Sequence, residues 1–241
     1  KAIFDNRTNA IAIVPHSRWG GKVLKAFLSR YQQLGGKLLK YTTYKKSQTD
    51  FARQLKHLLN LDESKTRHNN LRSVIDTKMH FVTRRRSDAE FIFVVASPRT
   101  ARLIAPQLRY YHAKDLPIYS TSHVYGGTEN TRENVDINGL LFCDIPLVLG
   151  DQKQTGSIKA EIIKQWPNKI SSSIRLYAIG IDAYNLIPYL KWLKDRPYER
   201  FAGYTGKLSI DKNNNVHRTL QWAKIIKGKA TVIQERLGAP L

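Results

Sequence analysis

A serine and a lysine spaced three residues apart could carry acyl-transfer chemistry in this chain. Ser209-Ile210-Asp211-Lys212 matches S-x-x-K, the motif in which penicillin-recognising enzymes hold their nucleophilic serine. In those enzymes the motif opens a buried helix and acts together with S-D-N and K-T-G elements. Here it runs into an Asn-rich turn at residues 211–215, and both companion elements are missing. The sequence therefore predicts no catalytic serine at this position.

Other catalytic and cofactor motifs are also missing from the sequence. It holds no phosphate-binding loop, no G-x-G-x-x-G and no G-x-S-x-G. None of the seven histidines pairs in H-x-x-x-H spacing, and one cysteine alone can form neither an internal disulfide nor the usual zinc site. That residue, Cys143, is expected to be buried in a strand. We therefore expect no catalytic residue, no cofactor and no metal.

A carboxylate, Asp182, lies in the middle of an apolar segment, residues 172–193, that predicts a long buried helix. A buried charge needs a partner. Arg175 stands seven residues earlier on roughly the same helical face and is a candidate partner. We favour a structural polar contact for Asp182 over a catalytic role.

The strongest basic cluster is Arg84-Arg85-Arg86, with Lys78 and His80 nearby. It ends a charged segment, residues 60–88, in which the hydrophobic periodicity fades and only a short helix near 69–76 is expected. Lys78 and the three arginines would make electrostatic contacts with phosphate or carboxylate groups of a partner. We interpret residues 60–88 as an inserted arm, and the alternative to such contacts is that this arm is disordered and solvated. Both interpretations stay open at this stage.

Two strand–helix units must position any binding groups. An apolar strand at 11–15 leads through a turn to a helix at 22–34, and a second strand at 91–96 leads to a helix at 100–111. Such alternation predicts a parallel sheet covered by helices on both faces, with ligands bound beyond the carboxyl ends of its strands. The candidate cleft residues at that edge are His16, Arg18, Trp19, Ser97, Ser120 and Ser122. The alternative for His16 is an ordinary loop position.

The remaining pattern extends this α/β organisation. Further strands are expected at 38–44, 117–120, 139–145 and 230–233, and further helices at 51–59 and 158–166. A polar loop spans residues 121–136, and Pro188 is expected to kink the helix at 172–193. Residues 205–210 and 216–226 predict a hairpin around the turn at 211–215, so residues 201–233 would form a C-terminal hairpin and last strand.

The composition is strongly basic. Lysines and arginines number 40 against 19 acidic residues, a formal charge of +21, in a chain of 241 residues that is 41% hydrophobic. This length suits one large domain or two lobes. The charge reflects either solvated surface or attraction to an anionic partner, such as nucleic acid, phospholipid headgroups or a cell-wall polymer. No nucleic-acid-binding module is recognisable, so specific nucleic-acid binding is not expected.

The sequence also lacks features of targeting. No apolar run approaches the roughly 18 residues of a membrane-spanning helix. No signal peptide is present, and the sole methionine is Met79. We therefore expect the chain to be a piece of a longer protein.

Short motifs follow one another in a fixed order along the chain. They are AIVPHSRWG at 12–20, YQQLGG at 31–36, FVVASP at 93–98, LPIYSTS at 116–122, NGLLFCDIP at 138–146, RLYAIGIDAY at 175–184 and YTGKLS at 204–209. As an ordered set they resemble the C-terminal domain of the LpoA (YraM) family, outer-membrane lipoproteins that activate class A penicillin-binding proteins. The resemblance implies an α/β, periplasmic-binding-protein-like fold of type I with two lobes. Residues 1–241 would form mainly the second lobe plus returning segments, because the units of the first lobe are absent.

The resemblance also implies a non-catalytic role. The chain would bind a class A penicillin-binding protein in the periplasm and stimulate its crosslinking of peptidoglycan, and it could also contact peptidoglycan itself. In the full-length protein a lipid, absent from this fragment, would provide the only attachment to the outer membrane. A periplasmic domain that binds a small solute is the alternative. A nucleic-acid binder, suggested by charge alone, ranks third.

Overall fold

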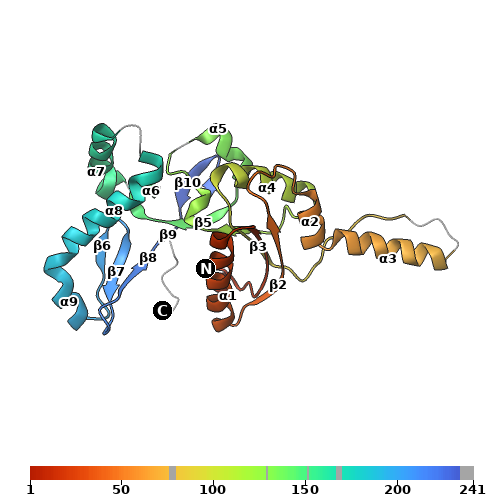
Figure 1. Ribbon diagram of the computed structural model, residues 1–241, viewed down its shortest axis with the longest axis horizontal. Coiled ribbons are helices and arrows are strands. Elements are labelled where there is room, and N and C mark those ends of the chain that lie inside the picture. The colour runs from red at the N-terminus through yellow and green to blue at the C-terminus, as the bar shows by residue number, and fades with distance from the viewer. Residues whose placement is uncertain (76–79, 129, 151, 167–169, 234–241) are drawn as a thin grey trace.

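The computed structural model describes residues 1–75, 80–128, 130–150, 152–166 and 170–233 (Figure 1). A seven-stranded sheet with the order β10-β9-β5-β4-β3-β1-β2 forms the centre of the larger body. Its strands are β1 (Asn9–Pro15), β2 (Lys37–Tyr44), β3 (Phe91–Val94), β4 (Ile118–Ser120), β5 (Leu141–Asp144), β9 (Gln221–Ile226) and β10 (Lys229–Val232). The first five run parallel, and β9 and β10 are antiparallel to their neighbours. The parallel sheet and the strands expected along it are thus confirmed.

Helices cover both faces of this sheet because the side chains of its central strands alternate. Ile11 and Ile13 of β1 enter the core beneath α2 (Ala52–Leu58) and α4 (Pro98–Tyr110), whereas Ala12 and Val14 enter the core beneath α1 (Arg18–Gln33). All four side chains are almost fully buried. The near-continuous apolar sequence of β1 is therefore the sequence of a strand buried on both sides.

Helix α1 begins at Arg18, four residues before the predicted start. The Ser17 side chain caps it by accepting a hydrogen bond from the Gly20 amide at 3.0 Å. Gly20 is required for close packing, because a Cβ there would lie 2.1 Å from the carbonyl oxygen of Pro15. Residues 18–21, expected in the turn before the helix, are instead its first turn.

The segment 60–88 contains a helix longer than the short one expected near 69–76. Helix α3 (Leu61–Val74) extends away from the body as an arm (Figure 1). The returning chain lies along it, since Phe81 stacks on His68 with ring centroids 4.1 Å apart and the Arg84 amide donates to Ser64 Oγ at 3.2 Å. These contacts give the described part of the arm, residues 60–75 and 80–88, a two-layered structure.

Short helical turns occupy the polar loop expected at 121–136. They are a 3-10 turn at Ser122–Val124, α5 (Thr131–Asn134) and a 3-10 turn at Val135–Ile137. After β5 the chain continues through α6 (Pro146–Leu149), α7 (Gln152–Gln165) and α8 (Ile170–Leu186). Helix α7 begins before the helix expected at 158–166 and ends one residue earlier, at Gln165.

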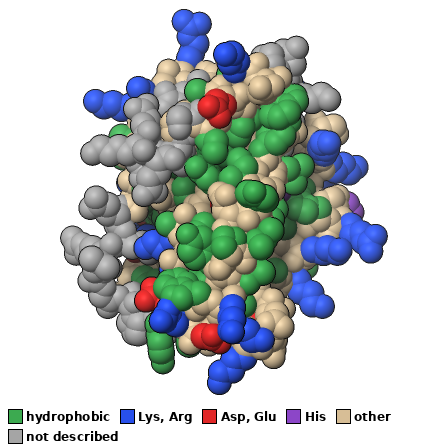
Figure 2. Space-filling model, turned by 90° about the vertical axis from the view of Figure 1, so that its left-hand side faces the viewer, with side chains coloured by type: hydrophobic (Ala, Val, Ile, Leu, Met, Phe, Trp, Pro, Cys, Tyr) green, Lys and Arg blue, Asp and Glu red, His purple; other side chains and the backbone are tan. Residues whose placement is uncertain are grey.

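The long helix predicted at 172–193 is divided, and its burial was overestimated. A 3-10 turn containing Pro188 separates α8 from α9 (Leu190–Asp195), so the predicted effect of this proline is confirmed. Ile174 and Ala178 are fully buried, but Leu176 is 67% exposed and Tyr184 is 76% exposed. Hydrophobic side chains are accordingly prominent on this side of the molecule (Figure 2). The physical reason is that α8 packs against the body along one side only.

A second, three-stranded sheet lies beside α8 and α9. Its strands are β6 (Phe201–Gly203), β7 (Gly206–Ile210) and β8 (Val216–Thr219), all antiparallel, and Leu208 and Ile210 pack with Leu186 and Leu193. The hairpin expected across 205–226 is only partly right. Strands β7 and β8 form it, but the chain then leaves this sheet at Leu220, and β9 pairs with β5 in the larger one.

Candidate functional site

The carboxyl edge of the parallel sheet gathers the candidate cleft residues. His16, Arg18 and Trp19 follow β1, Ser97 follows β3, and Ser120 ends β4, with Ser122 in the next turn. Asp144 ends β5 at the same edge. The topology therefore places the loops that carry these side chains along one edge.

Two of the serines at this edge are engaged within the fold. Ser97 caps α4 by accepting a hydrogen bond from the Thr100 amide at 3.3 Å, and its hydroxyl lies 3.0 Å from Thr100 Oγ1. Ser120 is buried and donates to the Val94 carbonyl at 2.6 Å. Their hydroxyls hold a helix end and a strand end.

The exposed side chains at the edge belong to the turn after β1. Within the described residues, the side chains of His16 and Arg18 make no hydrogen bond or ion pair, and Trp19 packs against His123 with ring centroids 4.7 Å apart. Burial lowers the pKa of His123, the nearby Arg175 charge lowers it further, and Asp144 opposes both effects. The turn after β1 and the turn after β4 thus form one continuous surface.

An ion pair holds α8 to this edge. Arg175 donates from Nε to Asp144 Oδ1 at 3.0 Å and from Nη2 to Asp144 Oδ2, and Nη2 also reaches the Tyr125 carbonyl at 2.9 Å. Asp144 is fully buried, whereas Arg175 is about one quarter exposed. A buried carboxylate needs such partners, so the pair joins α8, β5 and the turn after β4.

Asp182 is buried as expected, but Arg175 is not its partner. Its carboxylate accepts hydrogen bonds from the Tyr204 amide at 2.7 Å and from the amide and hydroxyl of Thr205 at 2.7 and 2.6 Å. Seven residues of helix span about 10 Å, too far for a direct contact with Arg175. Gly203 permits this approach, because a Cβ there would lie 2.5 Å from Asp182 Oδ2. The carboxylate of Asp182 thus makes a structural polar contact, as the favoured interpretation expected, and this contact joins α8 to the small sheet.

The three arginines of the basic cluster differ in their surroundings. Arg85 pairs with Asp115 and donates to the Arg86 carbonyl at 2.7 Å, and Arg86 pairs with Asp88 at 2.7 Å. The hydrogen bonds from these arginines hold the pKa values of Asp115 and Asp88 below their usual range. Arg84 is exposed, and no described residue pairs with its guanidinium group.

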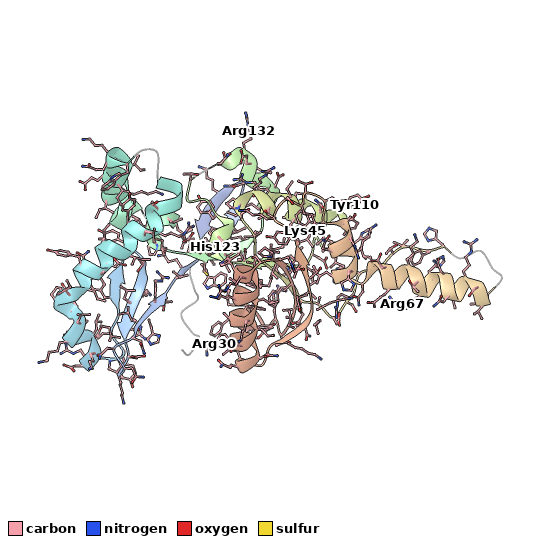
Figure 3. All side chains as sticks on the ribbon, in the orientation of Figure 1. Arg30, Lys45, Arg67, Tyr110, His123 and Arg132 are labelled. Atoms are coloured by element: carbon pink, nitrogen blue, oxygen red, sulfur yellow. The ribbon has the colours of Figure 1, made fainter. Side chains whose placement is uncertain are left out.

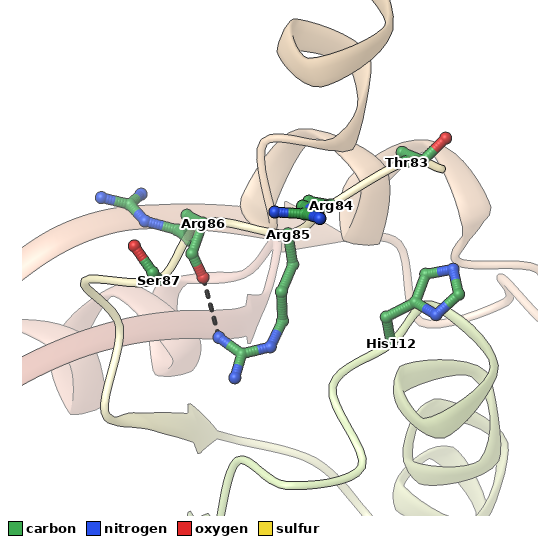
Figure 4. Close-up of a pocket in the computed structure, with 6 residues that line it drawn as sticks. All are labelled: Thr83, Arg84, Arg85, Arg86, Ser87 and His112. Atoms are coloured by element: carbon green, nitrogen blue, oxygen red, sulfur yellow. Dashed lines mark hydrogen bonds between the residues drawn. The ribbon is translucent and has the colours of Figure 1, made fainter. Parts of the chain in front are cut away.

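Arg84 borders an open hollow at the base of the arm. The hollow has a volume of about 410 Å³ and is lined by Thr83, Arg84, Arg85, Arg86, Ser87 and His112 (Figure 4). His112 follows Tyr111, the residue that caps the end of α4, and has a positive φ of 61°. Lys78, the fourth predicted electrostatic contact, lies outside the described residues.

Sequence reasoning did not assign roles to Asp144, His123, Asp115 and His112. A charged residue directly after a buried strand, as at Asp144, is a usable signal, because such a position lies at the ligand edge of a parallel sheet. Asp115 and His112 lie close to the basic cluster in space but about 30 residues from it in the sequence. Nothing in the sequence around them indicates this contact.

The described residues contain neither a metal-binding cluster nor a membrane-spanning helix. Among the described residues, no three His, Cys, Asp or Glu side chains are grouped so that they could hold a metal ion. In the same part of the chain no helix has both the length and the apolar character needed to cross a membrane. Cys143 is in β5 as expected but only partly buried, and this burial raises the pKa of its thiol.

Comparison with known families decides the relationship that the ordered motifs suggested. Residues 1–228 match the family described as "LppC putative lipoprotein". The chain belongs to the LppC family. The resemblance seen in the sequence is thereby confirmed over nearly its whole length.

Individual proteins similar to this LppC-family chain include penicillin-binding protein activators. The penicillin-binding protein activator LpoA of Photobacterium profundum is 27% identical over 216 residues, which are 88% of this chain and 34% of that protein. The solved LpoA (YraM) C-domain of Haemophilus influenzae, a regulator of PBP1A, matches with a TM-score of 0.64 and 24% identity over 97% of this chain and 64% of that one. The chain thus spans about a third of the length of its curated relatives.

The same fold occurs in solute-binding proteins. The leucine-binding protein LivK of Thermotoga maritima matches with a TM-score of 0.57 and 14% identity over 97% of this chain and 61% of that one. The periplasmic-binding-protein-like fold is therefore confirmed. Because its identity is low, this match supports the fold alone.

Proposed function

We propose that this chain is a non-catalytic regulatory module that binds a class A penicillin-binding protein and stimulates its crosslinking of peptidoglycan. The observation that carries the proposal is the family match across residues 1–228, together with relatives named as an activator and as a regulator of PBP1A. A protein that acts by contact needs an exposed complementary surface rather than an active site.

The surface of the chain supports a role in contact. Its net charge of +21 would steer it toward an acidic partner at low ionic strength. At the sheet edge the Ser97 and Ser120 hydroxyls and the Asp144 carboxylate bind within the protein, which leaves fewer groups for holding a solute. The same positive charge would also favour contact with the carboxylates of peptidoglycan.

The place of action that fits this role is the periplasm, at the outer membrane. This proposal is supported by the family description, which names lipoproteins, and by relatives named as penicillin-binding protein activators. Attachment would come from a lipid anchor in the full-length protein.

Binding should be measured directly. The 241-residue chain is titrated against the detergent-solubilised class A penicillin-binding protein of the same organism, with an unrelated basic protein of similar charge as the control. Saturable binding by the chain, and none by the control, is the expected result. Equal binding by both proteins would show that the interaction depends on net charge alone and is not specific to this chain. No binding by the chain would refute the proposal.

A small-solute receptor is the second candidate, favoured by the exposed His16, Arg18 and Trp19 at the edge where this fold binds ligands. Thermal unfolding with amino acids, sugars and muropeptides tests it. A saturable rise in the midpoint with one ligand would support the receptor, and no rise with any of them would count against it.

A further inference from the structure

The hollow at the base of the arm contains one arginine, Arg84, whose charge no described residue neutralises. Two of its arginines, Arg85 and Arg86, are paired with Asp115 and Asp88, and their side chains are 18% and 11% exposed. Arg84 and His112 line the same hollow, and within the described residues neither side chain has an ion-pair or hydrogen-bond partner. Both residues are exposed, and Figure 4 shows them on two different segments, Arg84 within residues 83–87 and His112 in the loop after α4.

Hydrogen bonds hold the backbone segment that carries Arg84 at the base of the arm. The Arg84 amide is bonded to Ser64 Oγ at 3.2 Å, and the Arg86 amide donates to the Leu59 carbonyl at 2.9 Å. A guanidinium group presents parallel N–H donors that match the two oxygens of a carboxylate. The carboxylate of a partner's Asp or Glu would therefore pair with Arg84.

The setting of the hollow suits a protein surface better than a lipid surface. Val82 is 57% exposed just before the hollow in sequence, and Tyr110 is 76% exposed at the end of α4 near the base of the arm (Figure 3). Tyrosine and arginine are enriched at protein interfaces, so Tyr110 near the base of the arm is the more telling of the two. By contrast, α3 exposes only two large apolar side chains, Leu71 and Val74, whereas a membrane-surface helix needs a broad apolar face.

We infer that this hollow is a carboxylate-binding pocket that receives an acidic side chain of the penicillin-binding protein, with Arg84 as its principal contact. The inference rests on the proposed function and adds the place and the chemistry of the contact. Asp115 modulates the pocket, because it occupies Arg85 and so reduces the positive charge offered to the partner.

Two substitutions of opposite sign test the pocket. Arg84→Gln removes the open guanidinium group and should weaken binding to the detergent-solubilised penicillin-binding protein about tenfold. Asp115→Asn releases Arg85 and should tighten the same binding severalfold. Arg132→Gln is the matched control: Arg132 is an exposed arginine of α5, and this change should alter binding less than about twofold (Figure 3).

The outcomes separate this inference from the proposed function. If the unmodified chain does not bind, both fail. If it binds, and Arg84→Gln binds as well as Arg132→Gln does, only the pocket is refuted. Purified peptidoglycan sacculi and vesicles of anionic phospholipid are tested in parallel. If Arg84→Gln weakens binding only to the sacculi or only to the vesicles, the protein contact is refuted and the pocket is assigned to that anionic surface instead. Unchanged thermal unfolding of the Arg84→Gln chain shows that any loss is local.

Discussion

Asp182 gives the clearest test of how the small sheet is attached to the rest of the molecule. Its side chain is 3% exposed and accepts three hydrogen bonds from Tyr204 and Thr205. Asp182→Asn keeps the shape of the side chain but replaces one acceptor oxygen by an N–H donor. At least one buried donor then loses its acceptor, and the remaining bonds lose the help of the negative charge.

The cost follows from these contacts. A hydrogen bond to a charged group contributes about 1.5–3 kcal/mol, and an unsatisfied buried donor costs about 1–3 kcal/mol. We therefore expect Asp182→Asn to lower the free energy of unfolding by about 3 kcal/mol. For a domain of this size, that corresponds to a fall in Tm of roughly 6–12 °C.

Thermal unfolding and amide hydrogen exchange measure this effect together. The Tyr204 and Thr205 amides should lose protection, and Asp195→Asn on the exposed end of α9 should change stability by less than about 0.5 kcal/mol. An Asp182→Asn protein with the Tm of the Asp195→Asn control and full protection at Tyr204 would refute the attachment.

Three further changes should affect stability in specified directions. Gly206→Ala, at a φ of 134° and with its Cβ 2.3 Å from the Thr219 carbonyl oxygen, should cost about 3 kcal/mol or more in denaturant unfolding, and a smaller loss would show that the turn is not constrained. Because burial lowers the pKa of His123, the folded state disfavours its protonated form, so stability should be complete above about pH 6.5 and decrease as the pH falls below it. His123→Gln should remove that part of the pH dependence between pH 5 and 7, and an unchanged profile would contradict the assignment. Arg175→Gln leaves Asp144 buried without its cation and should cost about 3 kcal/mol in urea unfolding, whereas a loss below about 1 kcal/mol would show that the pair does not hold α8.

The central strands could be predicted because their burial on both faces is visible in their sequence. Strands β1 and β3 are continuous apolar segments, and each leads into a helix. Helix α8 shows the limit of the same reasoning. An apolar sequence predicts burial, but whether another surface covers each side is decided by the rest of the fold, and Leu176 and Tyr184 lie on an uncovered side.

Long-range pairing was the other source of error. Residues 216–226 form a continuous β-type sequence, yet the chain changes sheets at Leu220, because β8 pairs with β7 and β9 pairs with β5. The partners of charged side chains could likewise be predicted only where both residues lie close together in the sequence. Asp88 stands two residues from Arg86 and could have been found, whereas Asp115 reaches Arg85 from 30 residues away.

The most direct test of the proposed function is the crosslinking rate of the purified class A penicillin-binding protein with and without the 241-residue chain. The chain is added at a concentration that saturates its binding, and the crosslinked fraction of newly made peptidoglycan is followed with time. We predict a faster rate with the chain. In a second series at a lower, subsaturating concentration, Arg84→Gln should stimulate the rate less than the unmodified chain does. A rate that stays unchanged at saturating chain would contradict the proposed stimulation of crosslinking.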